Sequence, residues 1–288
     1  MKLRFIDAEK ASFPIEVLCR ELGVSRSGYY AHLKRAESKR EREDQRLRLL
    51  IHIAHREGRH NYGRPKVHKA LKQLGEHVSA KRIARLMREE GLKGKMRRRF
   101  RRTTESNHSD LVHPNLLDRN FTAMAPNQRW VADITYLRTP TGFIYLAAVL
   151  DLFSRAIVGW ALGPSLEGSL VTKALEAALM RRCPEPGLLH HSDRGCQYTS
   201  KDYQSLLAAN GITCSMSGTG NCFDNAAMES WFSTLKLELR EDFKDLAEAQ
   251  LELFDYIEVF YNRKRLHSSL GYLSPAQFES AALTKAAA

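Results

Sequence analysis

Hydrophobic positions recur at helical spacing near the start of the chain. Between residues 13 and 35, an apolar stripe (Ile15, Val17, Leu18, Leu22) is followed by the turn Gly23-Val24. Ser25 is a favourable N-cap for a second helix over residues 26–35. This is the spacing of a helix-turn-helix, and it places Arg26, Ser27 and Tyr29 early in the second helix, where base or phosphate contacts would lie.

A second helical unit follows at residues 41–102. One helix is predicted over 41–57, another after the turn at 61–65, and a third is capped by Ser79. The apolar positions expected to face inward are Leu47, Leu50, Ile51, Ala54, Val67, Leu71, Leu74, Ile83, Leu86 and Met87. The basic residues expected to face outward, toward DNA phosphates, are Arg64, Lys81, Arg82, Arg85 and, in the basic run 93–102, Arg97, Arg98 and Arg99.

From residue 128 the pattern changes to strands alternating with helices. Strands are predicted at 128–138, 143–150, 156–162, 188–192 and 212–216, and helices at 170–179, 201–209, 225–240 and 247–263. This order favours an α/β core with a mixed sheet and flanking helices, preceded by an all-α basic region. The domains expected are 1–40, 41–102 and 128–288, with 103–127 as a linker.

Charge is distributed unevenly along the 288 residues, whose formal net charge is +12. Residues 1–120 hold 30 basic and 15 acidic residues, whereas residues 121–288 hold 15 basic and 18 acidic residues. A concentrated basic half is typical of nucleic-acid binding. No apolar run approaches the ~18 residues that cross a bilayer, and the five cysteines form no C-x-x-C pair. We therefore expect a cytoplasmic protein without membrane contact or disulfide framework.

Three carboxylates occupy unusual places in the core. Asp133 lies mid-strand, Asp193 lies just past the strand 188–192, and Glu229 lies inside the helix 225–240. Each alone is explained by capping or local hydrogen bonding. Together they can converge at one edge of a sheet, and such all-oxygen ligands suit Mg²⁺ or Mn²⁺, which also bind phosphate oxygens.

The segments around these acids carry a resemblance. Trp130-Val-Ala-Asp-Ile-Thr-Tyr136, His191-Ser-Asp-Arg-Gly195 and Asp224-Asn-Ala-Ala-Met-Glu-Ser230, with 35 residues between Asp193 and Glu229, resemble the signatures of the retroviral-integrase-like DDE transposases. The segment 261–271, followed by Ser274-Pro275, is similar to the C-terminal motif of that family. The chain most resembles the catalytic (OrfB) product of bacterial insertion sequences of the "insertion sequence three" type.

This resemblance implies a ribonuclease-H-like core and a polynucleotidyl transferase with Asp133, Asp193 and Glu229 as its metal-binding catalytic triad, which holds two ions. The basic residue of the family seven positions after the glutamate matches Lys236, which shares a helix face with Glu229 and Asn225. The resemblance implies that Lys236 and Asn225 contact DNA. Its implied partners are double-stranded DNA, as terminal inverted repeats and target, and further copies of the chain. Members of this family are commonly produced as a fusion with an upstream OrfA product.

Alternatives remain at this stage. A non-catalytic DNA-binding repressor and a nuclease acting on RNA hybrids would share parts of the pattern. Tyr261 near Arg265 and His267 is the only cluster that hints at a tyrosine recombinase. A zinc site at His52, His55 and His60 is disfavoured because no cysteine is near, and the loop 217–221 lacks the lysine of a phosphate-binding P-loop.

Overall fold

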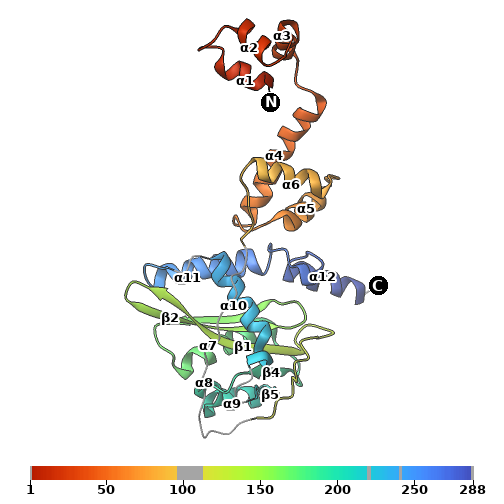
Figure 1. The fold of residues 1–288 in the computed structure, drawn as a ribbon. Coiled ribbons are helices and arrows are strands. Elements are labelled where there is room, and N and C mark those ends of the chain that lie inside the picture. The colour runs from red at the N-terminus through yellow and green to blue at the C-terminus, as the bar shows by residue number, and fades with distance from the viewer. Residues whose placement is uncertain (1, 96–112, 219–221, 240–241, 287–288) are drawn as a thin grey trace.

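The computed structural model describes residues 2–95, 113–218, 222–239 and 242–286, apart from the side chains of residues 222, 223 and 286. Two small helical units precede an α/β core, and Figure 1 shows them stacked in chain order above the core. The long helix α4 (Lys39–Glu57) leads from the first unit into the second. The order of helical region and mixed-sheet core agrees with the sequence prediction.

The first unit contains α1 (Lys2–Glu9), α2 (Ile15–Glu21) and α3 (Arg26–Lys34). Ser25 caps α3 by accepting a hydrogen bond from the Gly28 amide at 3.1 Å, as predicted. The unit has its own small core of Ile6, Leu18, Cys19 and Tyr29. Helix α1 was not predicted, because Ile6 is its only buried residue and leaves no apolar period to detect.

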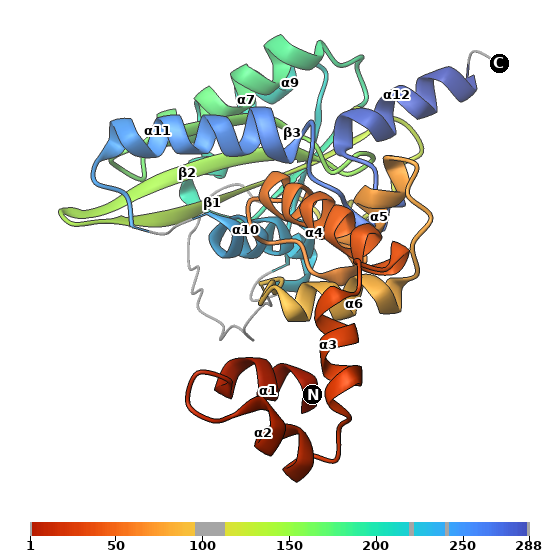
Figure 2. The same cartoon turned by 90° about the horizontal axis from the view of Figure 1, so that it is seen from above.

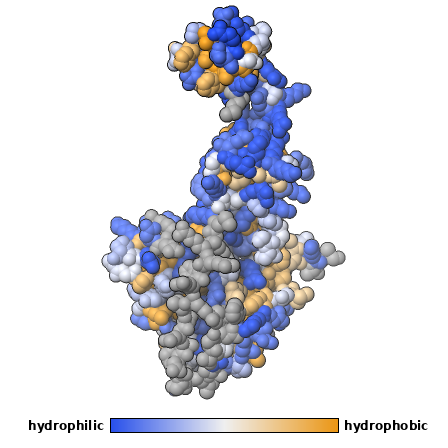
Figure 3. Space-filling model, viewed as in Figure 1, coloured by the Kyte–Doolittle hydropathy of each residue, from blue (hydrophilic) through white to orange (hydrophobic). Residues whose placement is uncertain are grey.

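The second unit packs α4 against α5 (Arg64–Gln73) and α6 (Ala80–Glu89). Ser79 caps α6, and Ser38 and Glu41 form a capping box that begins α4. The predicted inward positions are buried except Leu50, which is partly buried, and Leu74, which is 61% exposed because α5 ends one residue earlier. Figure 3 shows hydrophilic side chains over most of the visible face of this unit.

A buried carboxylate ties this unit together. Asp44 of α4 accepts a hydrogen bond from Arg82 at 2.7 Å and from Arg85 at 2.6 Å, both on α6. Burial raises the pKa of Asp44, but the hydrogen bonds and charges of Arg85 and Arg82 outweigh it and leave the pKa below its usual value. Arg82 and Arg85, expected to face DNA, therefore hold α6 on α4.

The core is built on a five-stranded sheet in the order β3-β2-β1-β4-β5. Strands β1 (Arg129–Thr139), β2 (Gly142–Asp151) and β3 (Ile157–Gly163) form an antiparallel meander. Strands β4 (Leu189–Ser192) and β5 (Thr213–Met216) extend the sheet in parallel from β1. All five strands were predicted to within two residues at each end, because their apolar runs are bounded by clear turn residues.

Helices cover both faces of the sheet. Alternate residues of β1 point to opposite faces: Trp130 and Ala132 pack with α7 (Gly168–Arg182) and α9 (Lys201–Ala209), and Val131 packs with α10 (Ala226–Glu238). The short helix α8 (Cys196–Thr199) follows β4, and the single 3₁₀ turn η1 (Cys222–Asn225) precedes α10. Helix α11 (Leu246–Phe254) lies along the face that α10 covers, as Figures 1 and 2 show.

The C-terminal segment continues α11 as wider π-helical turns, η2 (Asp255–Tyr261), and then as the 3₁₀ turn η3 (Ser268–Leu270) and α12 (Pro275–Ala286). This segment contacts the second helical unit. The amide of Leu266 donates to the Tyr62 hydroxyl at 2.8 Å, and the core cluster on this face runs without a break from α4 to the C-terminal segment. Across the described ranges, no helix has the length and apolar character needed to cross a membrane.

The segment expected to be a linker is partly integrated into the core. Leu117 is buried, and the amides of Leu116 and Leu117 donate to the Ser215 hydroxyl at 2.9 and 3.2 Å. The amide of Met216 also donates to the carbonyl of Pro114 at 3.4 Å. Residues 114–117 therefore lie along the edge strand β5 and cover its open side. Residues 96–112, including Arg97, Arg98 and Arg99, lie outside the described residues.

Replacement of Asp44 by Asn should weaken the second helical unit. Two partly exposed arginines lose their buried anion, so the free energy of unfolding of the full chain should fall by about 1–2 kcal/mol. Urea denaturation measures this difference. Glu43→Gln is the matched control, since Glu43 pairs with Arg46 at the surface. Equal effects of the two substitutions would contradict the role given to Asp44.

Candidate active site at the edge between β1 and β4

Strand pairing brings the two aspartates of the site together. In the parallel pair β1–β4, Val131 lies opposite His191. Asp133 and Asp193 each lie two residues further along the chain, so the same register places Asp133, in the middle of β1, beside Asp193, just past the carboxyl end of β4. Asp193 follows the end of β4 and turns back onto its own loop, where its Oδ1 accepts a hydrogen bond from the Gly195 amide at 3.0 Å.

Helix α10 brings the third acid to this edge. Asn225, the residue before the first turn of α10, donates its side-chain amide to the carbonyl of Ala132 at 3.1 Å. Ala132 precedes Asp133 in β1, so this bond fixes the start of the helix beside the strand. Glu229 lies in the first turn of α10, one turn after Asn225.

The three carboxylates influence one another electrostatically. Burial raises the pKa of Asp133 well above its usual value, the charge of Asp193 raises it further, and Glu229 adds a smaller contribution in the same direction. The hydrogen bond from the Ile134 amide to Asp133 Oδ1, at 2.8 Å, opposes this only in part. Burial also raises the pKa of Asp193. Like charges gathered in a partly dry site favour a bound proton or a bound cation.

The residues fit a hard divalent cation by their chemistry. All three candidates offer carboxylate oxygens, which Mg²⁺ and Mn²⁺ prefer. Among the described residues, no three His, Cys, Asp or Glu side chains lie close enough together to hold a metal ion. The acids are thus neighbours without forming a closed cage, and their role as ligands stays a prediction.

The two histidines next to Asp193 in the sequence form hydrogen bonds with neighbouring side chains of the core. His191 is hydrogen-bonded to Ser215 at 2.9 Å and to Ser217 at 3.1 Å, and His190 to Tyr203 at 3.0 Å. Burial lowers the pKa of His190 to about 3 and that of His191 to about 4. Both are neutral at pH 7, and their ring nitrogens stabilise β4 against β5 and α9.

Sequence reasoning did not identify Asp224 as a separate functional residue. Its buried carboxylate accepts hydrogen bonds from Asn115 at 3.0 Å, Arg119 at 3.1 Å and the Gly218 amide at 3.0 Å. It thereby joins residues 115–119 to the loop that leads into α10. Its place directly before Asn225 in the third motif was the only available signal.

The basic residue expected near the site lies at the edge of β1. Lys236 Nζ is 4.5 Å from the centroid of the Tyr136 ring, and Tyr136 lies three residues after Asp133. The tyrosine is 52% exposed, so this cation–aromatic pair reaches solvent. Asn225 differs from expectation: it is buried and bonds the β1 backbone, so it positions α10 instead of facing DNA.

The expected DNA contacts in the helical units divide into two groups. Arg26, Ser27, Arg64 and Lys81 are exposed. The prediction for Tyr29 is wrong, because its ring is fully buried between α1 and α2 and its hydroxyl donates to Asp7 at 3.3 Å. Tyr29 instead packs in the small core of the first unit.

The tyrosine of the recombinase alternative is also buried. Tyr261 donates its hydroxyl to the carbonyl of Arg155 at 3.1 Å, and burial raises its pKa. A nucleophilic tyrosine must reach a phosphorus atom and lose its proton, and neither condition holds here. The structure thus disfavours that mechanism.

Family models match the chain in three places. An "Integrase core domain" model matches residues 123–222, a second model of that description matches 229–283, and an "HTH-like domain" model matches 41–100. The first integrase match contains Asp133 and Asp193, and the second begins at Glu229.

Curated relatives match nearly the whole chain. It is 46% identical to the "Insertion element IS600 uncharacterized 31 kDa protein" of Shigella sonnei over 91% of this chain and 97% of that protein. It is 40% identical to "Transposase InsF for insertion sequence IS3A" of Escherichia coli K12 over 97% of this chain and 99% of that protein.

Solved structures with a similar fold include a simian T-cell lymphotropic virus intasome, with 12% identity, a TM-score of 0.46 and coverage of 76% of this chain and 70% of that chain. Another is the HTLV-2 integrase catalytic core domain with magnesium, with 17% identity, a TM-score of 0.41 and coverage of 55% and 99%. On the strength of the near-full-length sequence identity, the chain belongs to the family of transposases encoded by insertion sequences of the IS3 type.

Proposed function

We propose that this transposase cleaves DNA at the ends of its insertion sequence and joins them to target DNA at the edge between β1 and β4, with Asp133, Asp193 and Glu229 as the catalytic residues. As a DDE polynucleotidyl transferase it acts in DNA integration. The observation that supports the residue assignment best is the shared register of the two aspartates on adjacent parallel strands, beside the first turn of α10.

The acids would hold Mg²⁺ or Mn²⁺, with two ions per site. Bound there, the metal would activate an attacking oxygen and stabilise the leaving oxygen of an in-line phosphoryl displacement. The chain itself brings the carboxylates together, keeps Asp133 partly dry and fixes Glu229 through the bond between Asn225 and β1. The raised carboxylate pKa values favour a cation at this edge.

The other residues would hold and orient DNA. Lys236, about two turns after Glu229 on α10, would contact a phosphate or base edge close to the scissile bond. Arg26, Ser27, Arg64 and Lys81 would bind the terminal inverted repeats and the target, together with Arg97, Arg98 and Arg99, which lie outside the described residues. The chain would act as a homo-oligomer on nucleoid DNA in the cytoplasm, alone or fused to an upstream OrfA product.

Removing one charge from the triad separates catalysis from binding. Asp133→Asn, Asp193→Asn and Glu229→Gln should each lower cleavage and strand transfer by orders of magnitude, because each acid is a ligand for the same displacement. Binding of an element-end duplex should change less than about twofold, since the phosphate contacts lie elsewhere.

Single-turnover assays in Mg²⁺ and Mn²⁺, with gel-shift measurements on the same preparations, distinguish these effects. Asp202→Asn, at an exposed position in α9, is the matched control and should keep wild-type activity. If any triad variant kept near wild-type strand transfer, the acid replaced in it would not be a catalytic residue. Inactivity of the parent on its authentic ends would favour the repressor alternative.

The triad should also cost the metal-free protein stability. A carboxyl with a raised folded-state pKa binds its proton more tightly when folded, so stability falls as the pH rises above the ordinary value of 3.8 through the raised value. In chelator, Asp133→Asn should therefore melt at a higher temperature than the parent, and this difference should widen from pH 5 to pH 7.

Calorimetry of both proteins across this pH range measures the difference. Millimolar MnCl₂ should narrow it by stabilising the parent alone. A difference in melting temperature that stays constant with pH and metal would mean that Asp133 is not under electrostatic strain.

A further inference from the structure

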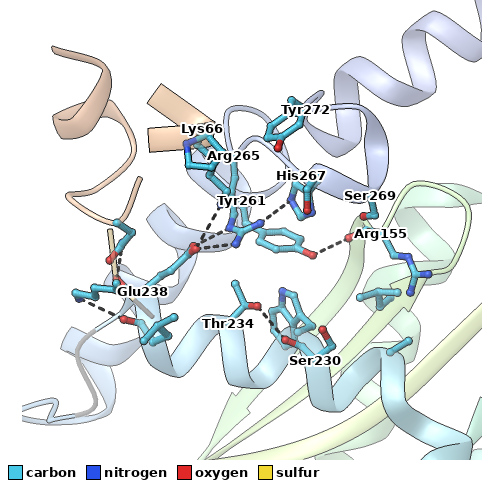
Figure 4. Close-up of a pocket in the computed structure, with 18 of the residues that line it drawn as sticks. Lys66, Arg155, Ser230, Thr234, Glu238, Tyr261, Arg265, His267, Ser269 and Tyr272 are labelled. Carbon is cyan, nitrogen blue, oxygen red and sulfur yellow. Dashed lines mark hydrogen bonds and ion pairs between the residues drawn. The ribbon is translucent and has the colours of Figure 1, made fainter. Parts of the chain in front are cut away.

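The C-terminal motif builds one wall of a cavity that the proposed chemistry leaves unused. The cavity has a volume of about 820 Å³ and lies between α10, the start of α5 and the segment 261–272 (Figure 4). Ser230, which directly follows Glu229, and Thr234, one turn later, belong to the α10 wall. The cavity thus begins one residue from the proposed active site and reaches the HTH-like domain.

The acid in this cavity is already neutralised. Glu238 receives two hydrogen bonds from Arg265, at 2.6 and 2.7 Å, and a third from the Tyr256 hydroxyl at 2.9 Å. Burial raises the pKa of Glu238, but the bonds and charge of Arg265 outweigh it and hold the pKa below its usual value. Among the described lining residues Glu238 is the sole carboxylate.

Three further cations line the cavity, and the one carboxylate near them is Glu238, which Arg265 already binds. Lys95 donates to the carbonyl of Leu237 at 3.2 Å, and Arg155 has no ion-pair partner among the described residues. Lys66 lies 3.9 Å from Glu238, at the edge of ion-pair distance, and burial together with the Arg265 charge lowers its pKa to about 8. Together with Arg265, four cationic side chains and one carboxylate line the cavity.

An unused hydrogen-bond donor lines the same space. The indole of Trp231 is 3% exposed, and its buried Nε1 has no hydrogen-bond partner in the described part of the chain. A buried N–H without an acceptor is uncommon and costs about 1–3 kcal/mol. Surplus positive charge and an unmatched donor are both satisfied by an anion with several acceptor oxygens.

We propose that this cavity binds a backbone phosphate of the DNA strand on which the neighbouring acids act. The inference rests on the proposed function and gives the C-terminal motif a role: it supplies Arg265, which neutralises Glu238 and leaves Lys66 and Arg155 for the phosphate. DNA is favoured over a free anion because the cavity joins the two DNA-acting parts of the chain. Such a contact positions the strand without reading its sequence.

The salt dependence of DNA binding tests this directly. The full chain and its Lys66→Met, Arg155→Met and double variants are titrated with a duplex carrying the element's terminal inverted repeat. Each substitution should weaken binding about tenfold near 0.15 M salt and make the slope of log K against log salt shallower by about 1, because one phosphate contact is lost. Lys66→Arg should restore both values.

Lys72→Met is the matched control, because Lys72 is exposed on the same helix and does not line the cavity. It should change affinity less than about threefold. Thermal melts identify any variant that fails to fold, and the Arg155→Met variant then decides the result independently of Lys66.

Two results would overturn the inference. One is that the folded double variant shows the same slope of log K against log salt as the parent, while the parent binds and transfers DNA. This result would leave the proposed function intact. The other combines two observations: inorganic phosphate raises the melting temperature of the parent but not that of the double variant, and the two proteins show the same salt dependence of DNA binding. That result would make a free anion the occupant of the cavity. A parent that neither binds nor joins DNA would instead contradict the proposed function itself.

Discussion

Helix α10 carries two acids that the fold treats in opposite ways. Glu238, near its end, is buried and neutralised by Arg265, so this end is tied to the C-terminal segment. At the other end, Asn225 bonds the β1 backbone and holds Glu229 near Asp133, where carboxylates repel one another. Because both ends are anchored, the helix can keep Glu229 in an unfavourable electrostatic position. The candidate site, the cavity and the contact with the HTH-like domain all depend on that placement.

The same helix connects parts of the chain that differ in charge. The basic helical half holds most of the surplus cations, whereas the core is nearly neutral. Asn61, before α5, donates to the carbonyl of Glu238 at 3.4 Å, and Tyr62 accepts from Leu266. DNA bound by the helical half would thereby be positioned relative to the helix that carries Glu229. Such a connection would orient a strand without contributing to the chemistry.

Much of the fold was predictable from periodicity, and the errors have physical causes. The strands and the capped helices α3 and α6 have strong local signals. Helices α1, α8 and α12 were not predicted. Helix α1 has one buried residue and α8 has only four residues, so neither has a detectable apolar period. Helix α12 follows the segment 261–275, which was interpreted as a family motif without a prediction of its secondary structure. Convergence of Asp133 with Asp193 depends on parallel pairing that only the sheet fixes. Tyr29 and Asn225 were wrongly expected to contact DNA. Tyr29 packs in the small core of the first unit, and Asn225 bonds the backbone carbonyl of Ala132.

The central claim is that Asp133, Asp193 and Glu229 form one divalent-cation site. Anomalous diffraction from crystals of the full chain saturated with Mn²⁺ tests it most directly. The account predicts a manganese peak between Asp133 and Asp193, with the Glu229 carboxylate at the same site and occupancy lost in Asp133→Asn crystals. Manganese bound only elsewhere, or no peak beside these aspartates at saturating concentration, would contradict it.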